Sequence, residues 1–145
     1  MSLFAEKLQD LLYDNNLTYK NLAKSSDISR TKLYFWLEHN IVPTTQSMIQ
    51  VARHFQCPMD FFLGRTEKTK IIFIDYPVSF SERLRALIQE KNITAYRACM
   101  QLHIKTAMIC DWLNNGTLPN YDNLLLLTDY FDCPADYLLG LSDDR

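Results

Sequence analysis

Apolar residues recur at helical spacing along most of the chain, in short runs that end at Asn, Gly or Pro. Leu33, Trp36 and Leu37 fall at i, i+3 and i+4 and form one apolar stripe. Ser29 precedes this stripe and can cap a first helical turn, because its hydroxyl accepts a hydrogen bond from a free backbone N–H group. The pattern predicts a short helix over residues 29–38 with one side in a core.

The outward positions of this helix carry Arg30, Thr31 and Lys32 near its start, and Tyr34 and Phe35 further along. Arg and Lys bind guanine edges and phosphates, whereas Thr forms adaptable hydrogen bonds and contacts thymine methyl groups. These are the residue types with which a helix reads the DNA major groove. An ordinary solvated helix face has the same composition, so this helix alone does not decide between the two interpretations.

The sequence contains an internal repeat. At an offset of 76 positions, residues 4–64 align with residues 80–140 without a gap, and 16 of the 61 aligned positions are identical. Two copies at this period indicate a tandem pair of domains, because solenoids stack three or more shorter units. We therefore predict an all-α chain with one domain at residues 1–64, a second at residues 80–145 and an extended linker at residues 65–79.

Caps and stop signals predict five helices in each copy. Thr18 and Thr94 are expected to cap the second helices, and Thr44 and Asn120 the fourth. Residues that tolerate positive φ are expected to end the helices, namely Asn16, Asn40, Gly64, Asn92, Gly116 and Gly140. The turn before the third helix contains Asp27 in the first copy and His103 in the second, and we expect a left-handed conformation at both.

Within the linker, residues 70–76 are rich in β-branched and aromatic side chains and are followed by Pro77. This composition predicts an extended segment that could form a strand. An apolar segment of this kind can pack on a domain, pair with the same strand of a second subunit, or lie between the two domains of its own chain. The sequence leaves these three locations open.

The charge distribution is more informative than the net charge of −2, which by itself counts against DNA binding. Residues 20–32 carry four cations and one acid, whereas residues 80–145 carry six cations and nine acids. Positive charge is thus concentrated around the third helix of the first copy, and the second copy is acidic.

Composition also narrows the class of protein. The four cysteines, Cys57, Cys99, Cys110 and Cys133, form no C-x-x-C pair, and we interpret them as reduced, mostly buried thiols of a cytoplasmic protein. No apolar run approaches the ~20 residues of a membrane span, and the N-terminus does not have the pattern of a signal peptide. Three histidines and three glycines supply neither a catalytic triad nor a glycine-rich phosphate loop. We therefore expect no enzyme, no cofactor and no metal site.

The order and spacing of certain residues, found twice, resemble the Cro/repressor-type (XRE) helix-turn-helix family. In the first copy they are Leu17-Thr18, Leu22-Ala23, Ile28-Ser29, Leu33, Trp36-Leu37, Pro43, Ala52, Phe55 and residues 60–64. In the second copy they are residues 112–116, Pro119, residues 123–125 and residues 136–140. The resemblance implies two five-helix lambda-repressor-like DNA-binding domains. It also implies that the third helix enters the major groove while the second crosses the DNA backbone.

In the first copy the resemblance assigns base contacts to Arg30, Thr31 and Phe35, with Ser29, Lys32 and Tyr34 beside them. Phosphate contacts are expected from Thr18, Tyr19 and Lys20 at the start of the second helix, where free N–H groups favour an anion. Tyr19 stands where this family often has glutamine.

The equivalent surface of the second copy consists of Lys105, Thr106, Ala107 and Met108, with Asp111 replacing Phe35. This surface is poorly suited to reading DNA, although a weak second contact stays open. The fourth helix of this copy has surplus apolar residues, namely Leu125, Leu126 and Tyr130. Since exposed apolar surface usually indicates a partner, we expect the second copy to serve mainly in interaction or dimerisation.

These observations predict a cytoplasmic, sequence-specific transcriptional regulator that binds double-stranded DNA as a homodimer, because twofold symmetry matches a palindromic site. The alternative is a protein-interaction module whose helix-turn-helix core has lost DNA binding, which the acidic second copy favours. The cluster Arg30, Thr31 and Lys32 separates the two, because an interaction module would not require it.

Overall fold

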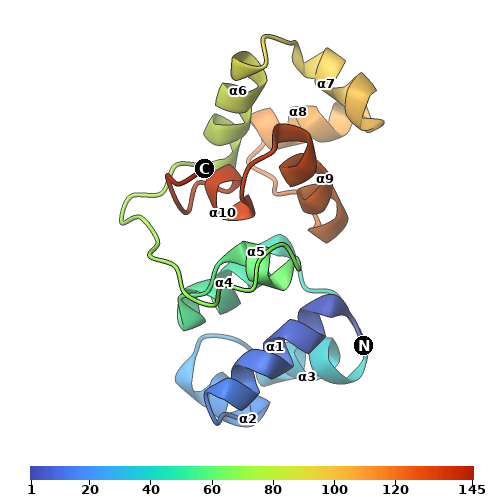
Figure 1. Ribbon diagram of the computed structural model, residues 1–145. Helices are drawn as coiled ribbons and strands as arrows, with labels where there is room; N and C mark the ends of the chain where they lie inside the picture. Colours follow the sequence, from blue (N-terminus) through green and yellow to red (C-terminus); the bar gives the residue numbers. More distant parts are fainter. The chain divides into compact units, whose positions relative to one another are not determined.

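The computed structural model describes residues 1–145 and consists of ten α-helices with no strand (Figure 1). This confirms the predicted all-α class. The chain divides into two compact units, Met1–Ile71 and Ile72–Arg145. None of the helices has the length and hydrophobicity that a membrane span requires.

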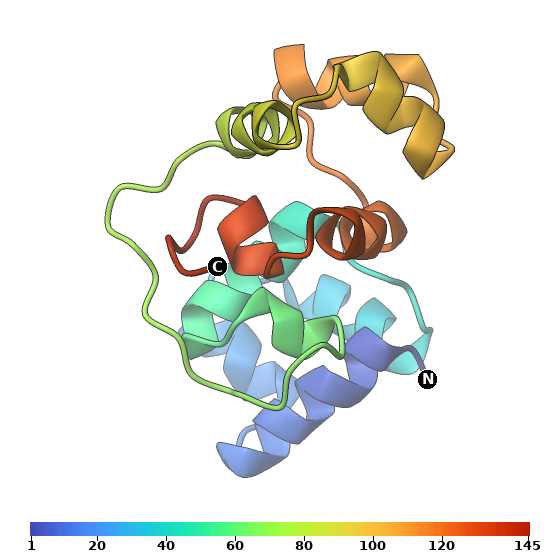
Figure 2. The ribbon, with the colours of Figure 1, turned by 45° about the horizontal axis from the view of Figure 1, so that its top comes forward.

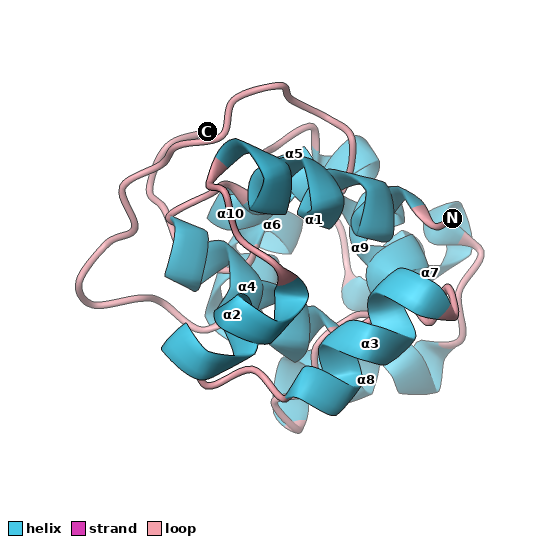
Figure 3. Cartoon of the chain, turned by 90° about the horizontal axis from the view of Figure 1, so that it is seen from below, coloured by secondary structure: helices cyan, strands magenta, loops and turns pink.

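The first unit contains five helices, α1 (Leu3–Asp14), α2 (Tyr19–Ser25), α3 (Arg30–Glu38), α4 (Thr45–Phe55) and α5 (Met59–Phe62). Phe4 of α1 is the centre of its aromatic core. The Phe4 ring meets Trp36 of α3 edge-on, with ring centroids 5.6 Å apart, and lies 5.2 Å from the ring of Phe62 in α5. Leu8 and Leu33 are fully buried beside them. The N-terminal helix therefore fixes α3 against the core, and Figure 3 shows α3 with its other side outward.

The second unit repeats this order with α6 (Phe80–Glu90), α7 (Ala95–Leu102), α8 (Thr106–Asn114), α9 (Tyr121–Phe131) and α10 (Ala135–Leu138). Phe80 packs on Trp112 with ring centroids 6.2 Å apart, as Phe4 packs on Trp36. The buried guanidinium of Arg83 lies over the Tyr137 ring at 3.9 Å and forms an ion pair of 3.1 Å with Asp143. The C-terminal residues are thereby attached to α6.

The predicted helix caps and stops are confirmed. Thr18, Thr44, Thr94 and Asn120 each accept a hydrogen bond from the N–H group three residues on. All six expected stop residues, three asparagines and three glycines, have positive φ. Gln56 and Asp132 also adopt the left-handed conformation, after α4 and α9, which the sequence analysis did not anticipate.

The linker contains no strand within this chain, and its pairing with the same segment of a second subunit stays a prediction. Figures 2 and 3 show residues 65–79 as an irregular segment without a helix. Single backbone hydrogen bonds hold it instead of a ladder. The N–H of Ile71 donates to the Gln56 carbonyl in the first unit (2.9 Å), and that of Val78 donates to the Gly140 carbonyl in the second (3.2 Å). The segment uses its N–H groups on the loops of both units and thus packs on each of them.

Candidate nucleic-acid interface

Helix α3 presents its polar side to solvent because its apolar stripe is held in the core. Leu33, Trp36 and Leu37 are all buried. Ser29 caps the helix as predicted, and its Oγ accepts from the N–H of Lys32 at 3.4 Å. The next three residues, 30–32, are exposed. The structure thus brings the predicted Arg-Thr-Lys cluster to the surface at the start of a well-anchored helix.

The turn between α2 and α3 differs from the prediction. Asp27 does not have positive φ. The preceding Ser26 is extended, and its hydroxyl donates to the Leu22 carbonyl (2.6 Å) and accepts from the N–H of Ile28 (3.2 Å). This side chain closes the turn, so no left-handed residue is needed there. In the second unit the equivalent residue is a leucine without a hydroxyl, and His103 closes the turn with φ 57°, as predicted.

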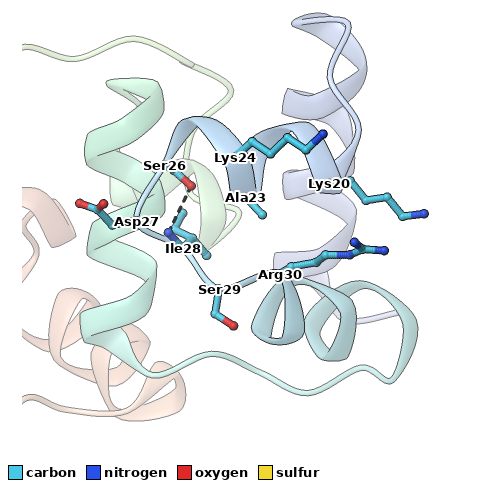
Figure 4. A pocket seen from close by; sticks show the side chains of 8 residues that line it. All are labelled: Lys20, Ala23, Lys24, Ser26, Asp27, Ile28, Ser29 and Arg30. Atoms are coloured by element: carbon cyan, nitrogen blue, oxygen red, sulfur yellow. Dashed lines mark hydrogen bonds between the residues drawn. The ribbon is translucent and has the colours of Figure 1, made fainter.

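An open hollow of about 490 Å³ lies at this turn, between α2 and the start of α3. Lys20 and Lys24 of α2 and Arg30 of α3 line it together with residues of the turn. In Figure 4 these three cationic side chains extend to the same side, whereas the Asp27 carboxylate points away from them. None of the three forms an ion pair. Unneutralised cations on one side of a hollow produce a local positive potential that attracts phosphate groups.

The second half of α3 carries an exposed aromatic cluster. Tyr34, Phe35 and His39 have ring centroids 5.1–5.5 Å apart, and the Tyr34 hydroxyl lies 3.1 Å from Nε2 of His39. Phe35 is 44% exposed although it is fully apolar, and Ile41 and Val42 in the following loop are exposed to a similar extent. Sequence reasoning placed Tyr34 and Phe35 on this surface but missed His39, although its i, i+4 spacing from Phe35 could have placed it beside that ring.

The start of α2 carries three residues for which phosphate contacts were predicted, namely Thr18, Tyr19 and Lys20. Thr18 is exposed, and its Oγ1 accepts from the N–H of Asn21 at 3.2 Å. Lys20 is exposed and Tyr19 half-buried. The structure therefore leaves Thr18 and Lys20 accessible to a phosphate and holds Tyr19 partly in the fold.

The equivalent surface of the second unit has different chemistry. Lys105 caps α8 without a side-chain hydrogen bond, and Thr106 and Ala107 are exposed. Met108 is half-buried, and its sulfur accepts from Nδ2 of Asn123 at 3.3 Å. Over residues 96–108 the second unit has two cations, Arg97 and Lys105, where residues 20–32 of the first unit have four.

The expected apolar surplus on α9 is mostly covered. Leu125 and Tyr130 are half-buried, and only Leu126 is exposed, to 38%. The Tyr130 hydroxyl donates to the side chain of Gln101, and the Lys91 ammonium lies 4.6 Å from the ring centroid. Gln101 and Lys91 therefore cover part of the apolar surplus expected on α9, and the role of this helix in binding a partner stays a prediction.

The N-caps of α3 and α8, Ser29 and Lys105, differ in chemistry, so substitutions at the two positions should change stability in opposite directions. Ser29→Ala removes a hydrogen bond to the N–H of Lys32 and should destabilise the first unit by about 0.5–1 kcal/mol. Lys105→Ser supplies a cap that α8 lacks and should stabilise the second unit by a similar amount. Each unit contains one tryptophan, so urea unfolding followed by fluorescence of single-tryptophan variants measures both. Equal effects of the same sign would contradict the assigned caps.

The structure leaves the predicted residues 29–32, 34, 35, 18 and 20 exposed, and it brings Lys20, Ser29 and Arg30 together at one hollow. It adds Lys24, whose position on α2 was part of the predicted basic stretch but not of the predicted contacts. Comparison with protein-family models, curated proteins and solved structures gave no match.

Proposed function

We propose that the chain is a sequence-specific DNA-binding transcriptional regulator with two tandem five-helix domains of the Cro/repressor (XRE) type. In this proposal α3 of the first unit enters the major groove. The observation that carries the proposal is the group of unneutralised cations Lys20, Lys24 and Arg30, which extend to one side of the hollow beside α3. A surface that served only to contact a protein would not require such a concentration of positive charge.

Each side chain has a distinct role in this proposal. Arg30 forms bidentate hydrogen bonds with a guanine, and Thr31 and Phe35 contact thymine methyl groups. Lys20 and Lys24 bind phosphates on either side of the groove and fix the register of α3 without reading sequence. Specificity thus comes from α3, and most of the affinity comes from α2.

The regulator acts in the cytoplasm as a homodimer in which the first unit of each copy reads one half-site. One helix reads too few bases for a unique site, and a twofold dimer doubles that number on a palindrome. The second unit, whose equivalent stretch of residues 96–108 has two cations instead of four, joins the two copies.

The test is selection from a random pool of duplex DNA with the purified chain at several salt concentrations. Enrichment of a palindrome is expected, and Arg30→Ala combined with Lys32→Ala should abolish it. Thr106→Ala, at the position in the second unit that matches Arg30, is the control and should retain the enriched sequence. Absence of binding even at low salt would overturn the proposal.

Two classes of variant should separate base contacts from phosphate contacts. Lys20→Ala and Lys24→Ala should weaken binding to every sequence alike and each reduce the slope of log K against log salt by about 0.9. Arg30→Ala should instead cost about 1–3 kcal/mol on the selected site and relax its preferred base. Both effects can be measured by fluorescence anisotropy with selected and scrambled duplexes over a salt series from about 50 to about 300 mM. Identical behaviour of Lys24→Ala and Arg30→Ala would contradict these roles.

The second candidate function is a protein-interaction module. The observation that favours it is the exposed aromatic cluster of Tyr34, Phe35 and His39 with neighbouring Ile41 and Val42. Exposed aromatic side chains are typical anchors of protein interfaces. The selection experiment distinguishes the two candidates, because this module would enrich no DNA sequence and show no salt-dependent binding.

A further inference from the structure

The aromatic cluster of Tyr34, Phe35 and His39 presents rings to solvent in a fixed arrangement. Tyr34 and Phe35 are 41% and 44% exposed, and His39 is exposed as well. The ring planes are inclined to one another by 45° to 69°, so no ring of the cluster covers another face to face. The contact between the Tyr34 hydroxyl and Nε2 of His39 holds the rings together. An exposed ring held in this way can receive a flat partner on its open side.

The major groove of a duplex offers these rings little to bind. The bases of a duplex are stacked, so their flat faces are covered, and an apolar side chain in the groove meets only the thymine methyl group. The apolar surface here is larger than Phe35 alone, because the N–H of Ile41 donates to the Phe35 carbonyl (3.3 Å) and brings the next loop beside the cluster. Ile41 and Val42 in this loop are 52% and 48% exposed.

Cations lie beside the aromatic rings on α3. Arg30 lies four positions before Tyr34, and Lys32 lies three positions before Phe35. At these spacings two side chains are neighbours on a helix surface. Neither cation forms an ion pair. The single acid of α3, Glu38, lies about 12 Å along the helix from Arg30. The start of α3 therefore favours phosphates, and its second half favours flat apolar groups.

The second unit differs in both respects. At the positions that match the aromatic cluster it has Cys110, Asp111 and Asn115, and over residues 96–108 it has two cations instead of four. The rings and the concentration of cations thus occur together in one unit and are lost together in the other, as expected if one ligand uses both. A ligand that combines phosphates with flat apolar groups is a strand of nucleotides whose bases are unstacked.

We propose that the outward face of α3 binds single-stranded DNA, with unstacked bases on the aromatic cluster and phosphates on Lys20, Lys24 and Arg30 at the hollow (Figure 4). Proteins that bind single strands combine cations with aromatic side chains, because every base has a flat face. The strand is assigned as DNA because α3 is proposed to meet a duplex, and an opened segment of that duplex supplies unstacked bases. In this respect the inference rests on the proposed function.

The first experiment is fluorescence anisotropy of the full chain with a labelled oligo(dT) of about 12 nucleotides and with an abasic strand of the same length. The abasic strand has the same phosphates but nothing that can stack, so it should bind at least about 10-fold more weakly. Equal binding of the two strands would overturn the inference, because phosphate contacts alone would then account for it.

A substitution at Phe35 separates stacking from other apolar contact. Phe35→Leu removes the ring but keeps an apolar side chain that is compatible with a helix. It should weaken oligo(dT) binding about 5- to 100-fold. Binding to the selected duplex should change by less than about threefold, because leucine can still contact a thymine methyl group. An unchanged affinity of this variant for oligo(dT) would overturn the inference.

Two further variants control for folding and for exposed aromatic side chains in general. Phe35→Tyr keeps a ring at the same position and should retain the affinity for oligo(dT). Tyr96→Leu removes a tyrosine that is 62% exposed in the second unit and should have no effect. An equal loss in Tyr96→Leu and Phe35→Leu would overturn the assignment of the site to α3.

The sugar of the bound strand is tested with oligo(dU) and oligo(rU) of equal length, which differ only in the 2′-hydroxyl group. Oligo(dU) should bind at least as tightly as oligo(rU). Tighter binding of oligo(rU) would overturn the assignment to DNA.

Failure of this inference and failure of the proposed function give different results. A chain that binds oligo(dT) through Phe35 but enriches no duplex sequence supports the single-strand site and overturns the regulator. A chain that enriches a palindrome but binds oligo(dT) no better than the abasic strand supports duplex reading by α3 and overturns the inference.

Discussion

Replacement of Leu33 by alanine is expected to destabilise the first unit by about 2–5 kcal/mol. Leu33 is fully buried in α3, which packs on α1 and α2. The substitution removes apolar contacts and leaves a cavity that the surrounding helices can fill only partly. A 71-residue unit has a total stability of about 4–11 kcal/mol. The loss therefore approaches the whole stability of the unit in which α3 is held.

The measurement is urea unfolding followed by Trp36 fluorescence in a Trp112→Phe background, which leaves one tryptophan as the reporter of the first unit. Thr31→Ala, an exposed change on the same helix, is the control and should stay within about 0.5 kcal/mol of the parent. If Leu33→Ala lowers the free energy of unfolding by less than about 1 kcal/mol, α3 is not anchored through this residue.

The same change tests whether the two units unfold separately. In a Trp36→Phe background, Trp112 reports the second unit, whose core contains its own buried residues around Leu84 and Ile109. We expect Leu33→Ala to leave the Trp112 transition unchanged. A shift of this transition by the same amount would mean that the chain unfolds as one cooperative body.

The helices could be predicted from the sequence because their ends depend on local chemistry. Thr18 caps α2 through a hydroxyl three residues from its donor, and Asn16 ends the preceding turn because asparagine tolerates positive φ. Both signals act within a few residues and do not depend on distant contacts. The repeat added a second instance of each, which made the assignments self-consistent.

Features that depend on tertiary contacts or on one particular side chain could not be predicted in the same way. Asp27 was expected to be left-handed, but the hydroxyl of Ser26 closes the turn instead. Tyr130 was expected to be bare, but Gln101, 29 residues away in sequence, accepts its hydrogen bond. Three N–H groups of the linker, those of Ile71, Ile74 and Val78, donate to carbonyls in the two units, and composition alone does not encode these partners.

The exposed residues of the candidate nucleic-acid interface could be predicted from the sequence, but their arrangement in space could not. Thr31 and Lys32 had to be outward once Leu33 and Trp36 were inward, because a helix has only one buried stripe. Arg30 lies three positions before Leu33, on the side of that stripe, and is exposed because α3 begins there. The convergence of Lys24 with Arg30 depends on the path of the turn, which the sequence analysis had assigned incorrectly.

Replacement of Gly140 by alanine should cost far more than the same change at Gly116, although both glycines have φ between 70° and 76°. Left-handed strain costs an alanine about 1–2 kcal/mol at either position. At Gly116 no atom lies within 4 Å of the added methyl group, so strain is the whole effect. At Gly140 the methyl group collides with the backbone carbonyl of Val78, and overpacking adds about 1–3 kcal/mol.

Val78 cannot move aside cheaply, because its own N–H donates to the Gly140 carbonyl at 3.2 Å. Gly140→Ala is therefore expected to destabilise the second unit by about 2–5 kcal/mol and to release the end of the linker. Urea unfolding with Trp112 as the reporter measures the loss, and faster hydrogen exchange at the Val78 N–H would show the release. Gly64→Ala is an intermediate case, since its methyl group meets only the flexible end of the Leu3 side chain. Equal losses at Gly116 and Gly140 would mean that backbone strain alone, and not the contact with Val78, makes glycine necessary at the end of α10.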